Sequence, residues 1–542
     1  MNKGRKILKK AASVALGSSM VLTGASIAFA AGSYQETAKT SLDAMVSSVA
    51  GAVDDYAQNM DKAFAGSTGK MTLTVEDTGK AILGTLLGQE DMSWLQDLTM
   101  DMKVSVKDGT EAIASTILLN DQKLCDLNIY EDLSEMKQYI QIPEVSDAYL
   151  ALDPAGSADE TTQEFMKEYM NALSDITSVI PDGKTVSTLL DRYGNLVIDN
   201  MEEGTATEET LSVEGIGEDC TVYEGQISSE DAVKTATELL EAAKSDSDIE
   251  SILNTWNDKL SSDENLYESF TTAVDKGLNA LKDTDTSDSE DSYLSTKIWV
   301  DENGRIAGRA LEIQEGDTTT PILTWQMPEN GSDFGYLLTI ASDDINTYSL
   351  SGSGQIDGDK LNGTYEFSLA DSISAIIEVK DYDTVSAKEG NLNGNYKITF
   401  PSSDTDNEDD YYSSILENFA LVLDLNSEKD SGSVALSIEN AGSTLGTLSI
   451  TGGAGEAVEI PDLASLKDVY DANNNDDMNA YAATLDFTSI MDNLSKAGVP
   501  DEVITYILSG GSATEDSSDT EASENSETSD NASDGSDTDA AA

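Results

Sequence analysis

Residues 98 to 109 read Leu-Thr-Met-Asp-Met-Lys-Val-Ser-Val-Lys-Asp-Gly, so that apolar and polar residues alternate. This period of two is typical of a β-strand with one buried face, and the Asp-Gly pair predicts a hairpin turn. Strand-like segments follow at 111–119, 123–130 and 138–142. The pattern predicts an antiparallel meander in which one face is apolar and the other carries Thr, Ser and charged side chains.

Helical periodicity surrounds this meander. From Ser33 to Phe64 the apolar residues recur at intervals of three and four, which predicts one amphipathic helix. The helical period returns at 160–190, a short strand is expected at 196–198, and strand-like sequence resumes at 211–227. Residues 228–282 carry three further helical stripes and predict a compact helical block.

A second β-rich region follows an acidic linker. Asn-Gly or Asp-Gly pairs, which predict hairpin turns, begin at residues 303, 330, 357, 362 and 393. Residues 361–369 read Leu-Asn-Gly-Thr-Tyr-Glu-Phe-Ser-Leu and are echoed at 392–400 by Leu-Asn-Gly-Asn-Tyr-Lys-Ile-Thr-Phe. Two copies predict a repeated hairpin within one sheet. Further strands are expected at 419–425, 433–438 and 444–451, and a short helix at 487–508.

The sequence therefore predicts an α+β protein with large, curved, open-barrel-like antiparallel meanders and an inserted helical block. The expected divisions are a signal peptide at 1–30, an N-terminal helix at 31–66, a first meander region with an inserted helix at 67–227, the helical block with its acidic linker at 228–292, a second meander region at 293–460, a C-terminal helical segment at 461–510 and a disordered acidic tail at 511–542. The patterns leave open whether the two meanders join into one sheet.

The N-terminus predicts export. Basic residues are followed by an uncharged stretch at 11–30 that ends in Ala28-Phe-Ala30, a form that signal peptidase accepts. The alternative is an uncleaved anchor. No later apolar run approaches the roughly 20 residues needed to cross a bilayer. We therefore expect a secreted protein, extracellular or associated with the cell envelope.

The charge balance excludes several functions. The 542 residues include 102 acidic and 31 basic side chains and no histidine, for a net charge of −71. Nucleic-acid binding rests on lysine and arginine, so nucleic acid is not an expected partner. Without histidine, Ser-His-Asp and Cys-His catalysis are excluded. An enzyme would have to use carboxylates or a serine–lysine pair.

The sequence assigns no catalytic, cofactor-binding or metal-binding residue. Asp77-Thr-Gly79 and Asp430-Ser-Gly432 resemble aspartic-protease triplets, but charged neighbours favour solvated hairpin tips. The Asn- and Asp-rich segment 471–479 lacks the glycine and the bidentate carboxylate of a calcium loop, and is interpreted as a surface turn.

Cysteine and tryptophan patterns leave structural interpretations. Cys125 and Cys220 could form one disulfide or remain two buried thiols. Trp256, Trp299 and Trp325 lie within strand alternation or on a helix stripe, so core packing is expected.

The stretch from Tyr193-Gly-Asn-Leu-Val-Ile-Asp through Leu211-Ser-Val-Glu-Gly and Cys220-Thr-Val-Tyr resembles a region of uncharacterised exported proteins of Gram-positive bacteria. A helix that leads into a long meander with inserted helices is also loosely similar to open-barrel carriers of lipids and lipoproteins. That resemblance implies an unclosed sheet whose apolar face shelters an acyl chain.

Three functions follow as hypotheses. The first is a non-enzymatic binding or carrier module that holds an apolar small molecule or lipid on a curved sheet. The second is an extracellular surface or interaction protein with a filled core, a protein partner and an acidic spacer tail. The third, ranked well below the others, is a carboxylate-dependent hydrolase with two converging carboxylates.

Overall fold

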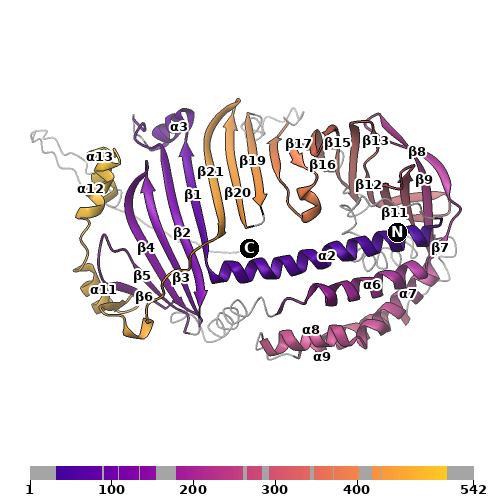
Figure 1. The fold of residues 1–542 in the computed structure, drawn as a ribbon, viewed down its shortest axis with the longest axis horizontal. Coiled ribbons are helices and arrows are strands. Elements are labelled where there is room, and N and C mark those ends of the chain that lie inside the picture. Colours follow the sequence, from indigo (N-terminus) through magenta and orange to yellow (C-terminus); the bar gives the residue numbers. More distant parts are fainter. Residues whose placement is uncertain are drawn as a thin grey trace, which may run out of the picture.

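In the computed structural model the chain forms a long, curved, antiparallel sheet with helices along one side (Figure 1). The structure describes residues 32–508 except 88–90, 108, 134, 154–178, 260–264, 283–291, 342–346, 370–371, 402–417 and 429. The expected signal peptide, the acidic tail, most of the linker and most of the helix expected at 160–190 lie outside the described residues. The α+β class with an open sheet is confirmed.

The first meander contains six strands, of which β2 to β5 match the predicted segments, whereas β1 and β6 were not predicted from the sequence. They are β1 (Ser67–Val75), β2 (Asp97–Lys107), β3 (Thr110–Leu119), β4 (Gln122–Asp132), β5 (Lys137–Gln141) and β6 (Tyr149–Leu152). One helix, α3 (Asp77–Leu87), is inserted after β1 and contacts β21.

The second meander begins before the helical block. Its strands are β7 (Glu202–Glu203), β8 (Thr207–Val213), β9 (Ile216–Ser228), β10 (Ser292–Asp301), β11 (Ile306–Glu315), β12 (Thr318–Gln326), β13 (Glu329–Asn330), β14 (Asp333–Ala341), β15 (Thr347–Asp357), β16 (Lys360–Leu369), β17 (Ser372–Asp383), β18 (Gly394–Thr399), β19 (Phe419–Glu428), β20 (Ser431–Asn440) and β21 (Ser443–Ala454). Consecutive strands pair with one another, apart from the two-residue strands β7 and β13 at the side.

The two meanders join into one continuous sheet, which answers the question that the sequence left open. β1 lies between β2 and β21, and Met71 is opposite Met100 on one side and Ile450 on the other. The order across the sheet is therefore β8 and β9 to β21 in sequence, then β1 to β6. At the far edge β22 (Val469–Asp471) pairs with β6 in parallel.

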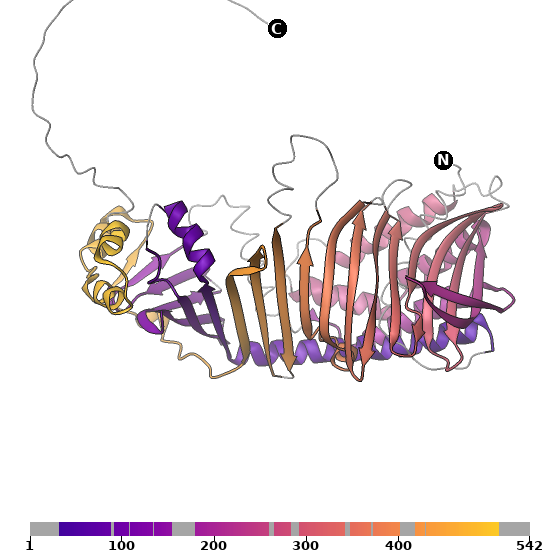
Figure 2. The same ribbon diagram turned by 90° about the horizontal axis from the view of Figure 1, so that it is seen from above.

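Helix α2 (Tyr34–Ala65) runs along most of the length of the sheet (Figures 1 and 2). Ser33 caps its first turn, because the Ser33 hydroxyl accepts a hydrogen bond from the Glu36 amide. Tyr34 and Ala38 pack into the main core cluster with Leu294 and Ile298 of β10. The helix predicted at 33–64 is thus observed.

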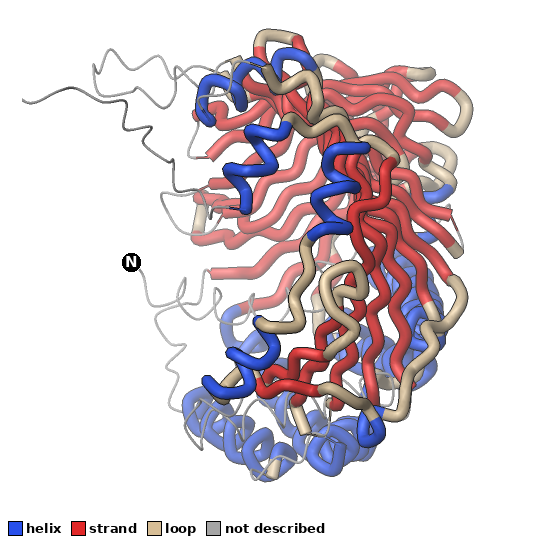
Figure 3. Tube along the Cα trace, turned by 90° about the vertical axis from the view of Figure 1, so that its left-hand side faces the viewer, coloured by secondary structure: helices blue, strands red, loops and turns tan. Residues whose placement is uncertain are grey.

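The helical block contains α6 (Gly183–Asp199), α7 (Ser229–Lys244), α8 (Ser247–Lys259) and α9 (Leu266–Lys282). These helices lie beside α2 on its far side from the strands (Figure 1), and in the view along the long axis the helices form a group below the strands (Figure 3). The three helices expected within 228–282 are observed as α7, α8 and α9.

The strand expected at 196–198 is wrong, because those residues form the last turns of α6. Packing against α2 favours the helical conformation of these residues. A Cβ atom on Gly194 would lie 2.6 Å from a Leu42 methyl, and one on Gly183 would lie 2.3 Å from the Ala50 carbonyl oxygen. The two glycines let the helices approach closely, and this tertiary contact outweighs the strand propensity of the Val-Ile pair.

Three of the five predicted hairpin turns of the second meander are observed, at residues 303, 330 and 357, where the following glycine has a positive φ. The hairpin turns predicted at residues 362 and 393 are wrong. Asn362 lies inside β16, at a bulge, and accepts a hydrogen bond from the Asp381 amide at 2.9 Å. Asn393 accepts from the Ser427 amide and donates to its carbonyl. The repeated segment is therefore a repeated strand, β16 and β18, and not a repeated hairpin.

The C-terminal segment covers the β4 end of the sheet. It contains a 3-10 turn (Leu463–Ser465), β22, α11 (Asn475–Ala482), α12 (Thr488–Lys496) and α13 (Asp501–Leu508). The single helix expected at 487–508 is interrupted by Pro500, which lies between α12 and α13. Val503 and Ile504 pack on Leu119 to form a separate small core.

Both cysteines are free thiols. Cys125 lies on β4 and Cys220 on β9, in opposite halves of the sheet, so one chain cannot bridge them (Figure 1). Burial raises the pKa of the Cys220 thiol to about 12. Trp299 and Trp325 are buried as expected, whereas the half-buried Trp256 donates its Nε1 hydrogen to the Val179 carbonyl.

Candidate functional site

One face of the sheet presents a continuous row of apolar side chains across seven strands. We call the side of the sheet that carries this row the apolar face. Strand pairing places the members of the row directly opposite one another, in the order Val379, Tyr396, Leu423, Leu436, Leu448, Leu73 and Leu98. Six strand spacings of about 4.8 Å give the row a length of about 29 Å.

Within the part of the chain that the structure describes, the central part of this face is exposed. Leu73, Leu98 and Ile450 are 42–43% exposed, and Val434 and Ile438 are 39% and 42% exposed. These residues lie on four adjacent strands, β20, β21, β1 and β2. A contiguous exposed apolar patch on a sheet costs free energy and marks a binding surface more often than a chance exposure.

Only the first half of helix α2 is buried against the sheet. Its buried residues all lie between Tyr34 and Val46, and Tyr56 in its second half is 59% exposed. The described helices therefore fill the core at the β9–β11 end and leave apolar side chains exposed at the centre of the sheet.

At the β18 side of the row lies a pocket of about 610 Å³. Its walls come from β11 to β18 and are dominated by aromatic and aliphatic side chains, namely Trp325, Phe334, Tyr336, Tyr365, Tyr382 and Tyr396, with Leu350, Ile356, Leu361, Ile377 and Val379. Binding pockets for small molecules have volumes of roughly 300–1,000 Å³ and mostly apolar walls.

The tyrosines give this aromatic pocket its polar groups. Tyr336 and Tyr365 meet edge to face, with ring centres 5.7 Å apart. The Tyr396 hydroxyl donates to the Leu392 carbonyl at 2.8 Å, and burial raises its pKa to about 12. Burial also raises the pKa of Tyr336, Tyr365 and Tyr382, so all four hydroxyls stay neutral at physiological pH.

An ion cluster contributes two side chains to the wall of the aromatic pocket. Arg305 lies within 2.5 Å of Glu218, 3.4 Å of Asp301 and 3.2 Å of Glu329, measured between nitrogen and oxygen atoms. Arg305 and Glu329 line the pocket. Burial, which the Arg305 charge only partly offsets, raises the pKa of Glu329, and the negative charges of Glu218 and Asp301 add to this effect. The cluster therefore contains three carboxylates and one guanidinium.

The opposite face of the sheet is polar, as expected from the alternation. The Thr72 and Thr99 hydroxyls are 3.0 Å apart, and those of Ser437 and Thr447 are 2.8 Å apart. A polar hollow of about 870 Å³ lies on this face near β1 and is lined by residues that include Lys70, Asp101, Lys103, Asp126 and Asp430.

Two carboxylates of the polar hollow are held by lysines. Asp430 pairs with Lys62 at 3.1 Å. Burial acts to raise the pKa of Asp126, but hydrogen bonds from Lys123 and Thr116 leave it below its ordinary value. Glu111, whose pKa is raised by burial and by the opposing Glu131, does not line either hollow.

The motifs considered for catalysis or metal binding do not line either hollow, with the exception of the Asp430 triplet. Asp430 lies in the turn between β19 and β20, as predicted for a hairpin tip, and it lines the polar hollow. Asp77 begins α3, so its assignment to a hairpin tip is wrong, although its side chain is exposed. Asn474 caps α11 within the Asn- and Asp-rich turn. Among the described residues no group of three or more His, Cys, Asp or Glu could hold a metal ion.

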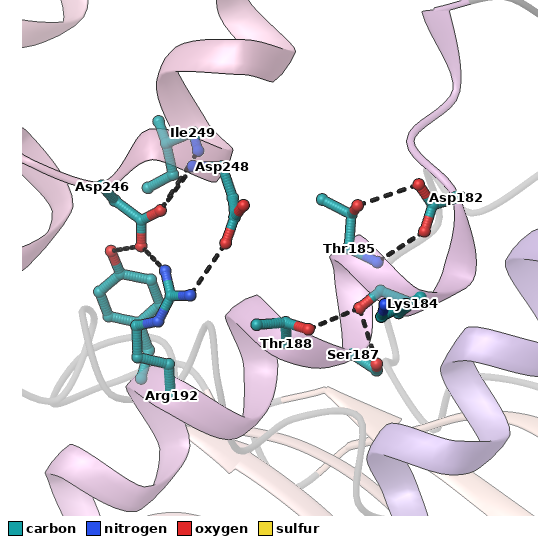
Figure 4. Close-up of polar contacts among 10 residues, drawn as sticks. Asp182, Lys184, Thr185, Ser187, Thr188, Arg192, Asp246, Asp248 and Ile249 are labelled. Carbon is teal, nitrogen blue, oxygen red and sulfur yellow. Dashed lines mark hydrogen bonds and ion pairs between the residues drawn. The ribbon is translucent and has the colours of Figure 1, made fainter.

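A third polar cluster lies in the helical block and is structural. Asp246 accepts hydrogen bonds from the Asp248 amide at 2.9 Å, from the Tyr193 hydroxyl at 2.7 Å and from Arg192, which also pairs with Asp248 at 2.9 Å (Figure 4). The Asp246 side chain is 1% exposed. It therefore caps α8 and fixes α6 to the junction between α7 and α8.

We expect Asp246→Ala to lower the free energy of unfolding by about 2–4 kcal/mol, because it removes a helix cap and leaves Arg192 and Tyr193 without their common acceptor. Burial opposes the ionised form of Asp246, but its donors leave the pKa below the ordinary value. This stability is therefore present above about pH 4 and is lost as the pH falls through the folded-state pKa.

Urea unfolding followed by circular dichroism at pH 7 and pH 3 measures both effects. Asp191→Ala on the exposed side of α6 is the control and should change stability by less than about 0.5 kcal/mol. If wild type and Asp246→Ala lose the same stability on acidification, Asp246 does not make the contribution described.

The aromatic pocket was missed by the sequence analysis, although a signal for it was present. The repeated Leu-Asn-Gly-x-Tyr segment places Tyr365 on β16 and Tyr396 on β18, two strands that both pair with β17. Both tyrosines line the pocket. If the two copies are interpreted as strands and not as hairpins, their equivalent tyrosines are expected on one face of the sheet.

No family model and no curated protein matches the chain. Among solved structures, the isotype 1 transferrin binding protein B from serogroup B Neisseria meningitidis aligns with 73% of this chain and 77% of its own, at 9% identity and a TM-score of 0.12. A score this low establishes no common fold. Within the described residues, no helix has the length and apolarity needed to span a membrane.

Proposed function

We propose that this chain is an exported, non-enzymatic carrier that holds the apolar part of a small amphiphile against the apolar face of its open sheet. The observation that carries the proposal is the apolar row, about 29 Å long, whose central part is exposed and whose β18 side leads into an aromatic pocket of about 610 Å³. This function agrees with what the sequence resemblance to exported proteins of Gram-positive bacteria and to open-barrel lipid carriers implies.

The dimensions suit an acyl chain. The hydrocarbon core of a bilayer, which holds two acyl chains end to end, is about 30 Å thick. The row therefore has room for one or two chains laid across the strands. Transfer of apolar surface onto the face gains about 25 cal/mol per Å² of area removed from water.

The alternatives fit less well. An interaction protein with a filled core would bury Leu73, Leu98 and Ile450, which are exposed. A hydrolase would need one carboxyl group with a raised pKa beside an ionised partner in a cleft. In the polar hollow the pKa of Asp126 is lowered and Asp430 is paired with Lys62.

Native mass spectrometry and organic extraction of the full chain, secreted from an expressing host, test the proposal. We expect a stoichiometric adduct that extraction releases as a species with an acyl chain. The protein should also take up tetradecanol when incubated with it. A bare polypeptide mass together with no uptake of tetradecanol would overturn the proposal.

A further inference from the structure

The aromatic pocket and its ion cluster indicate the charge of the ligand. We propose that the amphiphile carries a positively charged headgroup, an alkylammonium or quaternary ammonium, which lies in the aromatic pocket beside Glu329 while the acyl chain follows the apolar row. This inference rests on the proposed function, since it specifies the ligand class of the same site.

The first argument is charge. In the ion cluster three carboxylates surround one guanidinium, and all four side chains are largely buried, with exposures of 16% for Arg305, 14% for Glu218, 5% for Asp301 and 31% for Glu329. An excess of buried negative charge costs free energy unless a cation compensates for it. A bound ammonium group would supply the missing charge.

The second argument is that the donors of Arg305 are already used. Its Nη1 donates to the Met327 carbonyl at 3.0 Å and also pairs with Glu329, its Nη2 donates to Glu218, and its Nε faces Asp301. The guanidinium therefore has no free pair of N–H donors for an anionic headgroup, and the excess of carboxylates would repel such a group.

Glu329 is the acid of this cluster that is available to a ligand. Asp301 also accepts hydrogen bonds from the Asn303 and Arg305 amides within its own turn. Glu218 accepts from the Glu329 amide at 2.9 Å. Arg305 is the only partner that the described residues give to the Glu329 carboxylate, which lines the pocket and is the most exposed of the three.

The third argument is the aromatic wall. Tyr336, Tyr365, Tyr382 and Tyr396 line the same pocket as Trp325. The faces of aromatic rings attract cations, and cages of aromatic side chains are a recurring means of binding quaternary ammonium groups. The net charge of −71 on the whole chain also draws cations toward the site and repels anions.

The test compares three amphiphiles with the same acyl chain, namely tetradecyltrimethylammonium, tetradecanol and tetradecanoate, each below its micelle concentration. Isothermal titration of the full chain at low salt gives the dissociation constants. We expect the ammonium compound to bind about tenfold more tightly than the alcohol, and tetradecanoate to bind most weakly. Added salt should narrow these differences.

Glu329→Gln should weaken binding of the ammonium compound by about five- to tenfold and leave tetradecanol unchanged. Glu366→Gln is the matched control, because Glu366 follows Tyr365 on β16, is exposed and lies on the opposite face. It makes the same change of charge and should alter neither affinity. Melting curves of both variants check that they are folded.

The outcomes separate the two proposals. Equal affinities for the three compounds, or tightest binding of tetradecanoate, would overturn the inference about charge and leave the carrier function standing. Loss of tetradecanol binding in Glu329→Gln as large as the loss for the ammonium compound would also overturn it. Failure of all three compounds to bind the wild-type chain would overturn the carrier function itself.

Discussion

Replacement of Phe334 by alanine is expected to lower the free energy of unfolding by about 3–5 kcal/mol, the range for a buried phenylalanine. Phe334 is fully buried on β14 and packs with Leu361, Tyr365 and Val379. Opposite it lies Gly354, where a Cβ atom would come within 2.8 Å of the Phe334 ring. Because the ring occupies space that a glycine leaves open, its loss creates a cavity that the backbone cannot close.

Chemical denaturation of Phe334→Ala and wild type measures this loss. Phe487→Ala is the control, because Phe487 is 43% exposed, and its truncation should cost less than about 1 kcal/mol. A loss below about 1 kcal/mol for Phe334→Ala would show that this wall of the aromatic pocket is loosely packed. The pocket would then not have the fixed shape described here.

The second large effect is expected in binding and not in stability. Ile450→Glu places a charge in the centre of the exposed apolar patch, where it would have to be desolvated under a bound acyl chain. Affinity for tetradecanol should fall at least about tenfold. Because Ile450 is already 43% exposed, the free energy of unfolding without ligand should change by less than about 1 kcal/mol.

Thr451→Glu is the matched control. Thr451 is the next residue of β21, is also exposed and faces the polar hollow on the other side of the sheet. Thr451→Glu should leave the affinity for tetradecanol unchanged. If Ile450→Glu destabilises the unliganded chain by several kcal/mol, Ile450 belongs to a closed core. Equal effects of the two variants on affinity would place the ligand elsewhere.

Much of the fold could be predicted because the alternation is strict. In β2 every second residue from Leu98 to Val106 is apolar, and strands of this kind have one apolar face and one polar face. The long stripe at 33–64 likewise predicted α2 almost to the residue. Such patterns depend only on residues that are close in sequence, so they can be recognised without knowledge of the tertiary contacts.

The features that could not be predicted from the sequence depend on contacts between distant parts of the chain. Nothing in the alternation of β1 or β21 indicates that they pair with each other, because any apolar strand of suitable length could take either place. The Asn-Gly pair at 362 predicted a turn, yet the Asn362 side chain accepts from the Asp381 amide across a bulge. The ion cluster likewise unites Glu218 from β9, Arg305 immediately before β11 and Glu329 from β13.

The position of β1 has a consequence for biosynthesis. A ribosome delivers β1 and β2 early, so Met71 can pair with Met100 soon after both are made. The other edge of β1 waits for β21 at residues 443–454, when most of the chain has already been synthesised. Until then that edge presents unpaired amide and carbonyl groups, to which another strand can add. The middle of the sheet thus closes late, and premature release of an incomplete chain exposes it to aggregation.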